Sequence, residues 1–260
     1  MEHIQHHFSR VAPRYRQLRT TDSAPVLYIV QYLQHLPKIV AADFGCGTGR
    51  YPLKLFQYLG NRLFLYCIDN NREMLAQLQG YLKRHHIRNL KVLNHHAEDT
   101  SLQDNSLDCV FTFNAIHHFR SEKFFAQASR ILKNNGLLFI YTRFRSQNAR
   151  TIWGRYFPEF SRKETRLYEM PEIKRVLSGF PELAITDIKY FRFPRVASLD
   201  WLLNQARHHH YSTFSLYREE EFRTALKQFE KNLMTHFRDV NRIHWVDENV
   251  MLVVRKLRWN

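Results

Sequence analysis

Five short apolar runs between residues 38 and 142 alternate with segments whose apolar residues recur at helical spacing. The runs predict strands at 38–44, 62–69, 90–97, 106–116 and 137–142. Helices are expected at 24–36, 51–59, 72–85 and 121–136. Because strands that alternate with helices pair in parallel through right-handed crossovers, we expect a doubly wound α/β fold. The runs lack strict apolar–polar alternation, which is typical of strands buried on both faces.

A glycine-rich turn, "VAADFGCGTGRY" at 40–51, joins the first predicted strand to the next helix. Gly45, Gly47 and Gly49 carry no side chains, so their backbone N–H groups can approach a ligand closely. Asp69 ends the second predicted strand, where an acid accepts hydrogen bonds from ribose hydroxyls. Ligands of such sheets bind outside the carboxyl ends of the strands, so the sequence predicts a site for an adenosine-like group.

Asp43, just before the turn, narrows the choice of nucleoside. A dinucleotide would bring its pyrophosphate to this turn, where the Asp43 carboxylate would repel it. The glycines also have the spacing GxGxG instead of GxGxxG, with Arg50 at the sixth place. A ligand with a ribose and an ammonium group but no phosphate fits better. This favours S-adenosylmethionine as the cofactor over a turn that only shapes a corner.

Over residues 10–142 the sequence resembles the class I S-adenosylmethionine-dependent methyltransferases of the small-molecule type. "VAADFGCGTG" is similar to the first motif of that family, "YCIDNN" to the second and "NHHAED" to the third. "LDCVFTFNAIHHF" and "ILKNNGLLFIYT" are similar to the motifs around the fourth and fifth strands. The resemblance implies a Rossmann-like sheet of seven strands, mostly parallel, whose last strand is antiparallel. Strands six and seven then fall at 183–193 and 244–257, with a helical insertion at about 198–240 that caps the substrate side.

The resemblance also implies which residues hold the cofactor. Asp69 would bind the ribose, Asn70 would lie beside the adenine, and His96 stands where an acid near the adenine amine is usual. The full set of expected cofactor-binding residues is Asp43, Gly45, Cys46, Gly47, Thr48, Gly49, Asp69, Asn70, Met74, His96, Ala97, Glu98 and Asn114.

Three parts of the chain follow from the same resemblance. Residues 1–36 are expected to form an N-terminal helical lid, 37–142 the cofactor-binding core, and 143–260 the rest of the sheet with the helical insertion. Within the lid, "FSRVAPRYRQLR" at 8–19 is similar to the helix that covers the cofactor, with Tyr15 over its methionine end.

Methyl transfer requires chiefly that acceptor and methyl group be held in line, and a base only where the acceptor must lose a proton. His117 and His118 follow the fourth predicted strand, where the acceptor is expected. They are candidates for this base, or they shape the loop. Tyr15 is a further catalytic candidate, or it packs within the lid.

The stretch after the fifth strand is aromatic and basic, and it suggests an acidic or aromatic acceptor. Arg143 and Arg145 could bind an acidic acceptor, although solvated surface arginines are the favoured interpretation. The aromatic residues of "WGRYFPEF" (153–160) line an acceptor pocket or pack the insert. "HHH" at 208–210 predicts an exposed polar turn, and we expect no metal.

The formal net charge of +15 leaves an RNA methyltransferase as a rival function. The basic residues are scattered, however, and "FNAIHHF" lacks the D/N-P-P-Y type of motif that flanks a flipped base. A non-catalytic cofactor-binding protein is a second rival. The acceptor, the atom methylated (O, N, C or S) and the oligomeric state stay open. The product from the cofactor would be S-adenosyl-L-homocysteine.

The three cysteines, Cys46, Cys67 and Cys109, lie in or beside predicted strands and form no CxxC pair. They favour buried free thiols over a zinc site or a disulfide framework. No apolar run is long enough to span a bilayer, and no signal peptide is evident at the start. We therefore expect a cytoplasmic protein.

Overall fold

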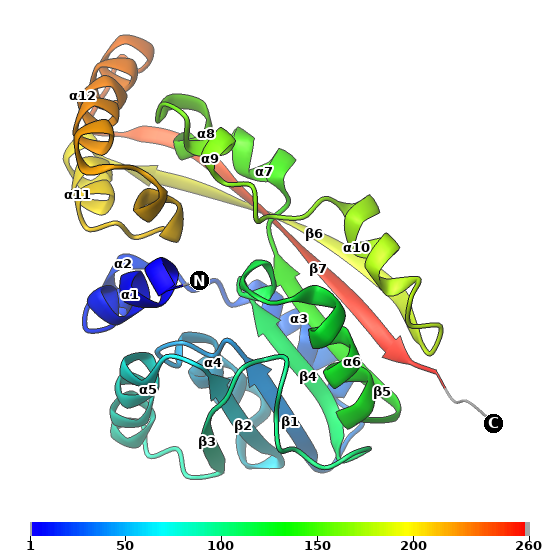
Figure 1. Cartoon of the computed structure of the whole chain (residues 1–260). Coiled ribbons are helices and arrows are strands. Elements are labelled where there is room, and N and C mark those ends of the chain that lie inside the picture. Colours follow the sequence, from blue (N-terminus) through cyan, green and yellow to red (C-terminus); the bar gives the residue numbers. More distant parts are fainter. Residues whose placement is uncertain (1, 258–260) are drawn as a thin grey trace. The chain divides into compact units, whose positions relative to one another are not determined.

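The computed structural model describes residues 2–257, which pack into two compact units. The core unit comprises Thr20–Thr142, Met170–Lys189 and the chain from Val250 on. The second unit comprises the chain up to Arg19, Arg143–Glu169 and Tyr190–Asn249. Figure 1 labels the elements of both units. The expected division at residues 36 and 142 stays a prediction.

A seven-stranded sheet has the strand order β3-β2-β1-β4-β5-β7-β6. Its strands are β1 Ile39–Phe44, β2 Leu63–Asp69, β3 Leu90–Asn94, β4 Leu107–Phe113, β5 Leu132–Thr142, β6 Leu183–Ala197 and β7 Ile243–Lys256. Strands β1 to β5 pair in parallel, and β7 is antiparallel to β5. The predicted Rossmann-like methyltransferase fold with seven mostly parallel strands is therefore confirmed. Strands β6 and β7 contribute residues to both units.

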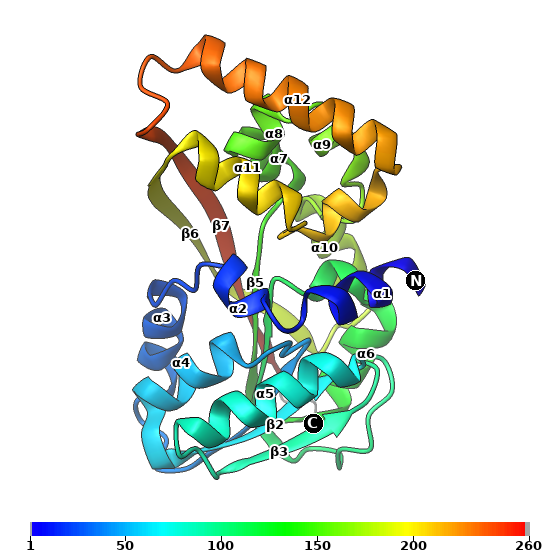
Figure 2. The ribbon, with the colours of Figure 1, turned by 90° about the vertical axis from the view of Figure 1, so that its left-hand side faces the viewer.

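Helices cover both faces of the core sheet. They are α3 Ala24–Leu33, α4 Arg50–Leu59, η1 Gly60–Arg62, α5 Arg72–Arg84, η2 Ile116–His118, α6 Ser121–Ile131 and α10 Met170–Leu177. Figure 1 shows α6 in front of strands β4 and β5 and α3 behind them. The view in Figure 2 shows α4 and α5 from the side, next to β2 and β3.

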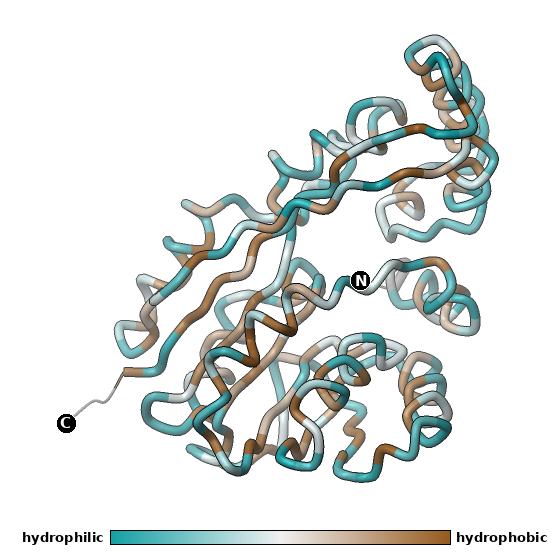
Figure 3. Tube along the Cα trace, turned by 180° about the vertical axis from the view of Figure 1, so that it is seen from behind, coloured by the Kyte–Doolittle hydropathy of each residue, from teal (hydrophilic) through white to brown (hydrophobic). Residues whose placement is uncertain are grey.

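The central strands are buried on both faces, as their continuous apolar runs predict. Phe111 on β4, Phe139 on β5 and Leu252 on β7 are all fully inaccessible to solvent. Figure 3 shows apolar residues along these strands and along the strand that leads to the C-terminus, while the loops are mostly hydrophilic. This two-sided burial makes the core sheet a rigid frame for the loops at its carboxyl edge.

The boundary between α6 and β5 differs from the sequence-based expectation. A helix was predicted to residue 136, but α6 ends at Ile131 and β5 begins at Leu132. Leu132 pairs with Leu107 of β4 ahead of a register shift, and Asn135 adopts a positive φ of 64°. Strand pairing here overrides the local helical pattern, because the pairing depends on a residue distant in sequence.

Helices make up most of the second unit. They are α1 Glu2–Val11, α2 Tyr15–Leu18, α7 Arg145–Arg150, α8 Ile152–Tyr156, α9 Phe160–Lys163, α11 Leu199–Arg207, η3 Ser212–Leu216 and α12 Glu219–His236. Elements α11, η3 and α12 lie between β6 and β7, so the predicted helical insertion is present in the chain. Its expected position over the substrate stays a prediction.

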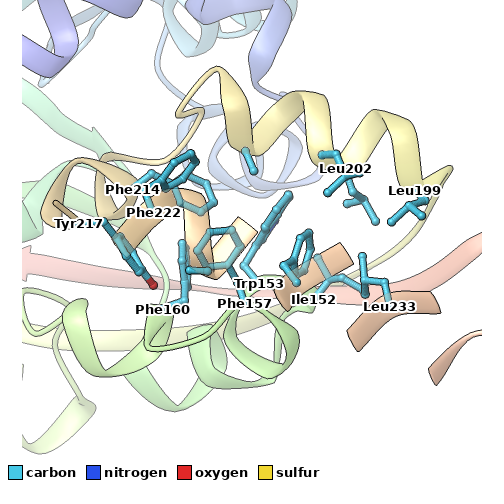
Figure 4. Packing of buried hydrophobic residues seen from close by; sticks show 14 of the residues in the cluster. Ile152, Trp153, Phe157, Phe160, Leu199, Leu202, Phe214, Tyr217, Phe222 and Leu233 are labelled. Atoms are coloured by element: carbon cyan, nitrogen blue, oxygen red, sulfur yellow. The ribbon is translucent and has the colours of Figure 1, made fainter. Parts of the chain in front are cut away.

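Three aromatic residues of "WGRYFPEF", Trp153, Phe157 and Phe160, belong to the buried core of the second unit, which Figure 4 shows from close by. Trp153 stacks on Phe229 of α12 with ring centroids 5.1 Å apart. Phe157 meets Phe214 edge-on at 5.0 Å, and Phe160 is almost fully buried. Of the two interpretations of this stretch, packing of the insert therefore holds for these three residues.

The turn at 208–210 is not the exposed polar turn that its three histidines predict. His210 is buried, and its Nδ1 lies 3.0 Å from the carbonyl oxygen of Gln205. Burial holds the pKa of His210 well below its ordinary value. Burial and the nearby charge of Arg10 lower the pKa of His209 to about 4. Both rings are therefore neutral at physiological pH and pack among aromatic side chains.

Candidate functional site

The glycine-rich turn is held against the end of the neighbouring strand β2. The backbone N–H groups of Gly45 and Cys46 both donate to the carbonyl oxygen of Ile68, at 2.8 and 3.1 Å. Gly45, Gly47 and Gly49 have φ angles of 73°, 53° and 84°, in the left-handed region that favours glycine. The turn therefore lies between the carboxyl ends of β1 and β2, beside the point where the strand order reverses from β1 to β4.

The three glycines differ in what surrounds them. A Cβ atom on Gly45 would lie 2.4 Å from the Cβ of Ala115, and one on Gly49 would lie 3.0 Å from Cγ of Leu78. A Cβ atom on Gly47 would meet nothing within 4 Å. Gly45 and Gly49 are thus required for packing within the protein, whereas Gly47 leaves its backbone open on the side where a ligand can approach.

Asp69, the last residue of β2, is hydrogen-bonded to the turn. Its Oδ2 accepts from the N–H of Gly47 at 2.9 Å, and its Oδ1 accepts from the N–H of Asn71 at 2.9 Å. Burial raises the pKa of Asp69, and these backbone hydrogen bonds oppose the rise. A carboxylate has about four acceptor sites, so Asp69 can hold the turn and still accept hydrogen bonds from a diol.

Asp43 lies inside β1, and its side chain has no ion-pair partner among the described residues. It is 1% exposed, and its Oδ1 has no hydrogen-bond partner in the described part of the chain. Burial, together with the charge of Asp69, raises its pKa well above the ordinary value. A buried, unpaired carboxylate costs free energy, and a bound cation would offset that cost.

Replacing Asp43 with asparagine is expected to raise the free energy of unfolding of the ligand-free protein, by about 1–2 kcal/mol at pH 8. The unfolded Asp43 loses its proton near its ordinary pKa, while the folded one retains it to higher pH. The stability that protonated Asp43 contributes to the folded protein is therefore lost as pH rises above the ordinary pKa of an aspartate. Denaturant unfolding at pH 5 and pH 8 should show a gap between variant and wild type that widens with pH.

The exposed Asp104, replaced by asparagine in the same way, is the matched control and should show no such pH-dependent gain. A destabilised Asp43→Asn protein, or a gap independent of pH, would contradict this account of the buried carboxylate.

Two of the residues expected near the adenine lie together. Nδ2 of Asn70 is 3.4 Å from Nδ1 of His96, beyond the end of β2. Ala97 and Met74 are buried close to the same edge, with 7% and 2% of their surface exposed. Oε1 of Glu98, by contrast, accepts from the backbone N–H of Arg120, just before α6. These positions are compatible with the predicted cofactor roles, which stay predictions.

The residues expected on the acceptor side follow β4. Asn114 has a φ of 53°, and its N–H donates to the carbonyl oxygen of Tyr141 at 2.7 Å. His117 and His118 are the last two residues of the short helix η2; both are half-buried, and their ring centroids lie 4.0 Å apart. Thr48 in the turn is buried. The carboxyl edge thus brings the two histidines to the strand next to the glycine turn.

Tyr15 belongs to the second unit, where it is described with its own neighbours. Its ring meets Phe8 edge-on at 6.2 Å, and the guanidinium of Arg19 lies 5.9 Å from its centroid. Its expected place over the cofactor stays a prediction.

Arg143 is not the solvated surface arginine that the sequence favoured. It is buried, and its Nε donates to the carbonyl oxygen of Glu248 at 3.1 Å. Its Nη1 donates to the hydroxyl of Tyr211, and its Nη2 donates to Oδ1 of Asn249, each at 3.4 Å. Arg143 therefore ties together segments of the second unit. Arg145 likewise donates to the carbonyl oxygen of Leu167.

Sequence reasoning missed an aromatic wall beside the turn. Tyr51, the second residue of α4, stacks on Phe113 at the end of β4, with centroids 4.1 Å apart and ring planes 6° apart. Arg50 is also bound locally, since its Nε donates to Oγ1 of Thr21 at 2.8 Å. The position of Tyr51, directly after the glycine turn, was the available signal. The three cysteines are buried free thiols, as predicted.

Within residues 2–257 no group of three histidine, cysteine, aspartate or glutamate side chains is arranged to hold a metal ion. The same described residues include no helix long and apolar enough to cross a membrane.

Comparisons with known proteins agree with this fold. Residues 42–140 match a family model described as a methyltransferase domain. A comparison with curated proteins gives no match. The structure of the YcgJ protein from Bacillus subtilis is 15% identical, covers 92% of this chain and 100% of its own, and has a TM-score of 0.65. The [4+2]-cyclase SpnF is 14% identical, with coverages of 91% and 81% and a TM-score of 0.61.

Geranyl diphosphate C-methyltransferase from Streptomyces coelicolor A3(2) is 15% identical to this chain. The match covers 90% of this chain and 76% of that one, with a TM-score of 0.57. That enzyme was solved with S-adenosyl-L-homocysteine and a geranyl thiolodiphosphate bound. The family model confirms the resemblance to a methyltransferase domain over residues 42–140, and the solved structures share the fold.

Proposed function

We propose that this chain, which carries a methyltransferase domain of the class I fold at residues 42–140, transfers a methyl group from S-adenosylmethionine to a small-molecule acceptor. The observation that carries the proposal is the arrangement of Asp43, Gly47 and Asp69. The buried carboxylate of Asp43 and the half-buried carboxylate of Asp69 stand near the carboxyl ends of adjacent strands, and the one open glycine of the turn donates to Asp69.

The residues present suit this cofactor. Asp69 can accept hydrogen bonds from the ribose hydroxyls while it holds the turn. Gly47 lets its backbone approach the ligand, and the unpartnered Oδ1 of Asp43 favours the cationic end of the ligand over a phosphate. Asn70, His96 and the buried Met74 are the proposed neighbours of the adenine.

When bound, S-adenosylmethionine supplies a methyl group already activated on a sulfonium sulfur. The protein then has to position the acceptor and keep water away. We assign the acceptor to the edge of β4, where His117 and His118 would orient it or take a proton from it. The stacked pair of Tyr51 and Phe113 provides an apolar wall beside the same edge.

Two observations support a small acceptor. "FNAIHHF" lacks the D/N-P-P-Y type of motif, and one protein of the same fold is a geranyl diphosphate C-methyltransferase. The charge of +15 favours the RNA alternative. Because the [4+2]-cyclase SpnF has the same fold, a function other than methyl transfer is kept as an alternative for this chain.

Incubation with tritiated-methyl S-adenosylmethionine tests these alternatives. We expect label in a small-metabolite extract and none in total RNA. Alanine at His117 or His118 should lower the rate of transfer about 100-fold, the usual contribution of acid–base catalysis, and leave cofactor affinity unchanged. Alanine at the exposed His85 is the control. Label only in RNA would overturn the proposed acceptor class, and label in neither would favour the non-catalytic alternative.

A further inference from the structure

A cavity of about 350 Å³ lies entirely within the second unit. It is lined by residues from the end of α7, from α8, from β6, from the end of α12 and from β7. Nothing in the cofactor site belongs to it, because Asp43, the glycine turn and Asp69 are all in the core unit. The volume is at the low end for ligand pockets, which corresponds to a ligand of about one ring with a substituent.

The charged side chains around the cavity are unbalanced. Arg150, Arg155 and Arg192 line it, and Glu248 is the only acid in its lining. Arg150 donates to Oε2 of Glu248 through Nε at 2.8 Å, and Nε of Arg192 lies 3.7 Å from Oε1 of the same carboxylate. Arg155 is exposed, its guanidinium group is hydrogen-bonded to the Tyr156 hydroxyl, and it has no ion pair with a carboxylate in the described part of the chain. The lining therefore carries an excess of two positive charges and attracts an anion.

The remaining walls are largely aromatic. Tyr156, His236 and Phe237 form a cluster in which each ring centroid lies 4.9 to 5.5 Å from the other two. Trp245 of β7, half-buried, also lines the cavity. Its indole N–H is directed to Oδ1 of Asp247 at 3.2 Å. Aromatic walls bind flat apolar groups, while guanidinium groups bind carboxylates and phosphates through paired hydrogen bonds.

We propose that this cavity is a binding site for a small anionic aromatic ligand, an aryl phosphate or aryl carboxylate, held by Arg155 and Arg192 at its anionic group and by Tyr156 and Trp245 at its ring. The inference goes beyond the proposed methyl transfer and does not depend on it. The cavity is partly open to solvent, and its volume of about 350 Å³ matches a small molecule.

Calorimetry with phenyl phosphate tests the site. We expect phenyl phosphate to bind about tenfold more tightly than either phenol or inorganic phosphate, since only it engages both the ring and the anion contacts. Arg155→Gln should weaken this binding about tenfold, the effect of one charge-assisted hydrogen bond. Arg207→Gln, at an exposed arginine of the same unit outside the cavity, should leave it unchanged.

A second variant pair tests the aromatic wall. Trp245→Leu should weaken binding, and Trp201→Leu, at an exposed tryptophan of α11, should not. Thermal melting shows whether each variant is folded. If Trp245→Leu is not folded, the test rests on Arg155→Gln. Absence of phenyl phosphate binding, or affinity equal to that of inorganic phosphate, would overturn the proposal. The proposal would also be overturned if an oligouridylate bound more tightly than phenyl phosphate and this binding were lost in Arg155→Gln.

S-adenosylmethionine affinity, measured on the same proteins, separates this result from the proposed function. The cavity variants should bind the cofactor as the wild type does, because they change none of the residues expected to bind it. Loss of phenyl phosphate binding with cofactor binding intact is thus specific to the cavity.

Discussion

Replacing Asp69 with alanine is expected to weaken S-adenosylmethionine binding about 10- to 100-fold, as measured by calorimetry. The carboxylate is proposed to accept hydrogen bonds from the ribose, and hydrogen bonds to a charged group contribute about 1.5–3 kcal/mol each. The substitution also removes the acceptor of the Gly47 N–H, so the turn that approaches the ligand loses one of its supports. Both effects act in the same direction.

Asp104→Ala is the matched control for this prediction. Asp104 is an exposed aspartate of the core unit that pairs with Arg130 on the surface, away from the ends of β1 and β2. Its replacement should change neither cofactor affinity nor stability by more than a small amount, since exposed ion pairs contribute little. Unchanged affinity in Asp69→Ala would show that the predicted cofactor does not use this carboxylate.

Alanine at Gly45 should chiefly lower stability, whereas alanine at Gly47 should chiefly weaken cofactor binding. At Gly45 the new Cβ would overlap Ala115, and the backbone would be strained, so unfolding should become easier by about 3 kcal/mol or more. At Gly47 the Cβ meets no protein atom within 4 Å, and only the backbone strain of about 1 kcal/mol remains. Gly47→Ala should therefore stay folded but bind the cofactor at least about tenfold more weakly.

Denaturant unfolding and calorimetry on the two variants measure these profiles. Gly60 serves as the control, because it also has a positive φ and an open Cβ position but lies in η1 at the far end of α4. Gly60→Ala should lose at least as much stability as Gly47→Ala, because Gly60 combines a positive φ with a ψ of −144°, but it should bind the cofactor normally. Normal binding by Gly47→Ala would mean that the open side of the turn is not the ligand side.

Local pattern was a good guide wherever one segment decides its own structure. The strand that ends at Phe44 and the helix that begins at Arg50 follow from apolar periodicity and from the glycines between them. The end of α6 could not be predicted in this way. Leu132 leaves the helix because it pairs with Leu107, and pairing between strands is not visible in the local sequence.

The residues of the candidate site could be predicted from the sequence, but some of their properties could not. Asp43, the glycines and Asp69 could be named from order and spacing, because a strand, a turn and a helix in succession bring their ends to one edge of a parallel sheet. The burial of Asp43 with an unpartnered oxygen could not be foreseen. Arg143 was misjudged for a related reason, since its partners Glu248 and Asn249 are distant in sequence.

The sequence by itself determined the alternating elements of the core, the class of fold and the type of turn at its edge, because these depend on periodicity and on the conformational freedom of glycine. Tertiary structure alone decided which glycine is open and which carboxylate is unpaired. It also gathered three arginines and an aromatic wall from five separate segments around one cavity. Those properties depend on contacts between distant residues, and only the folded chain brings such residues together.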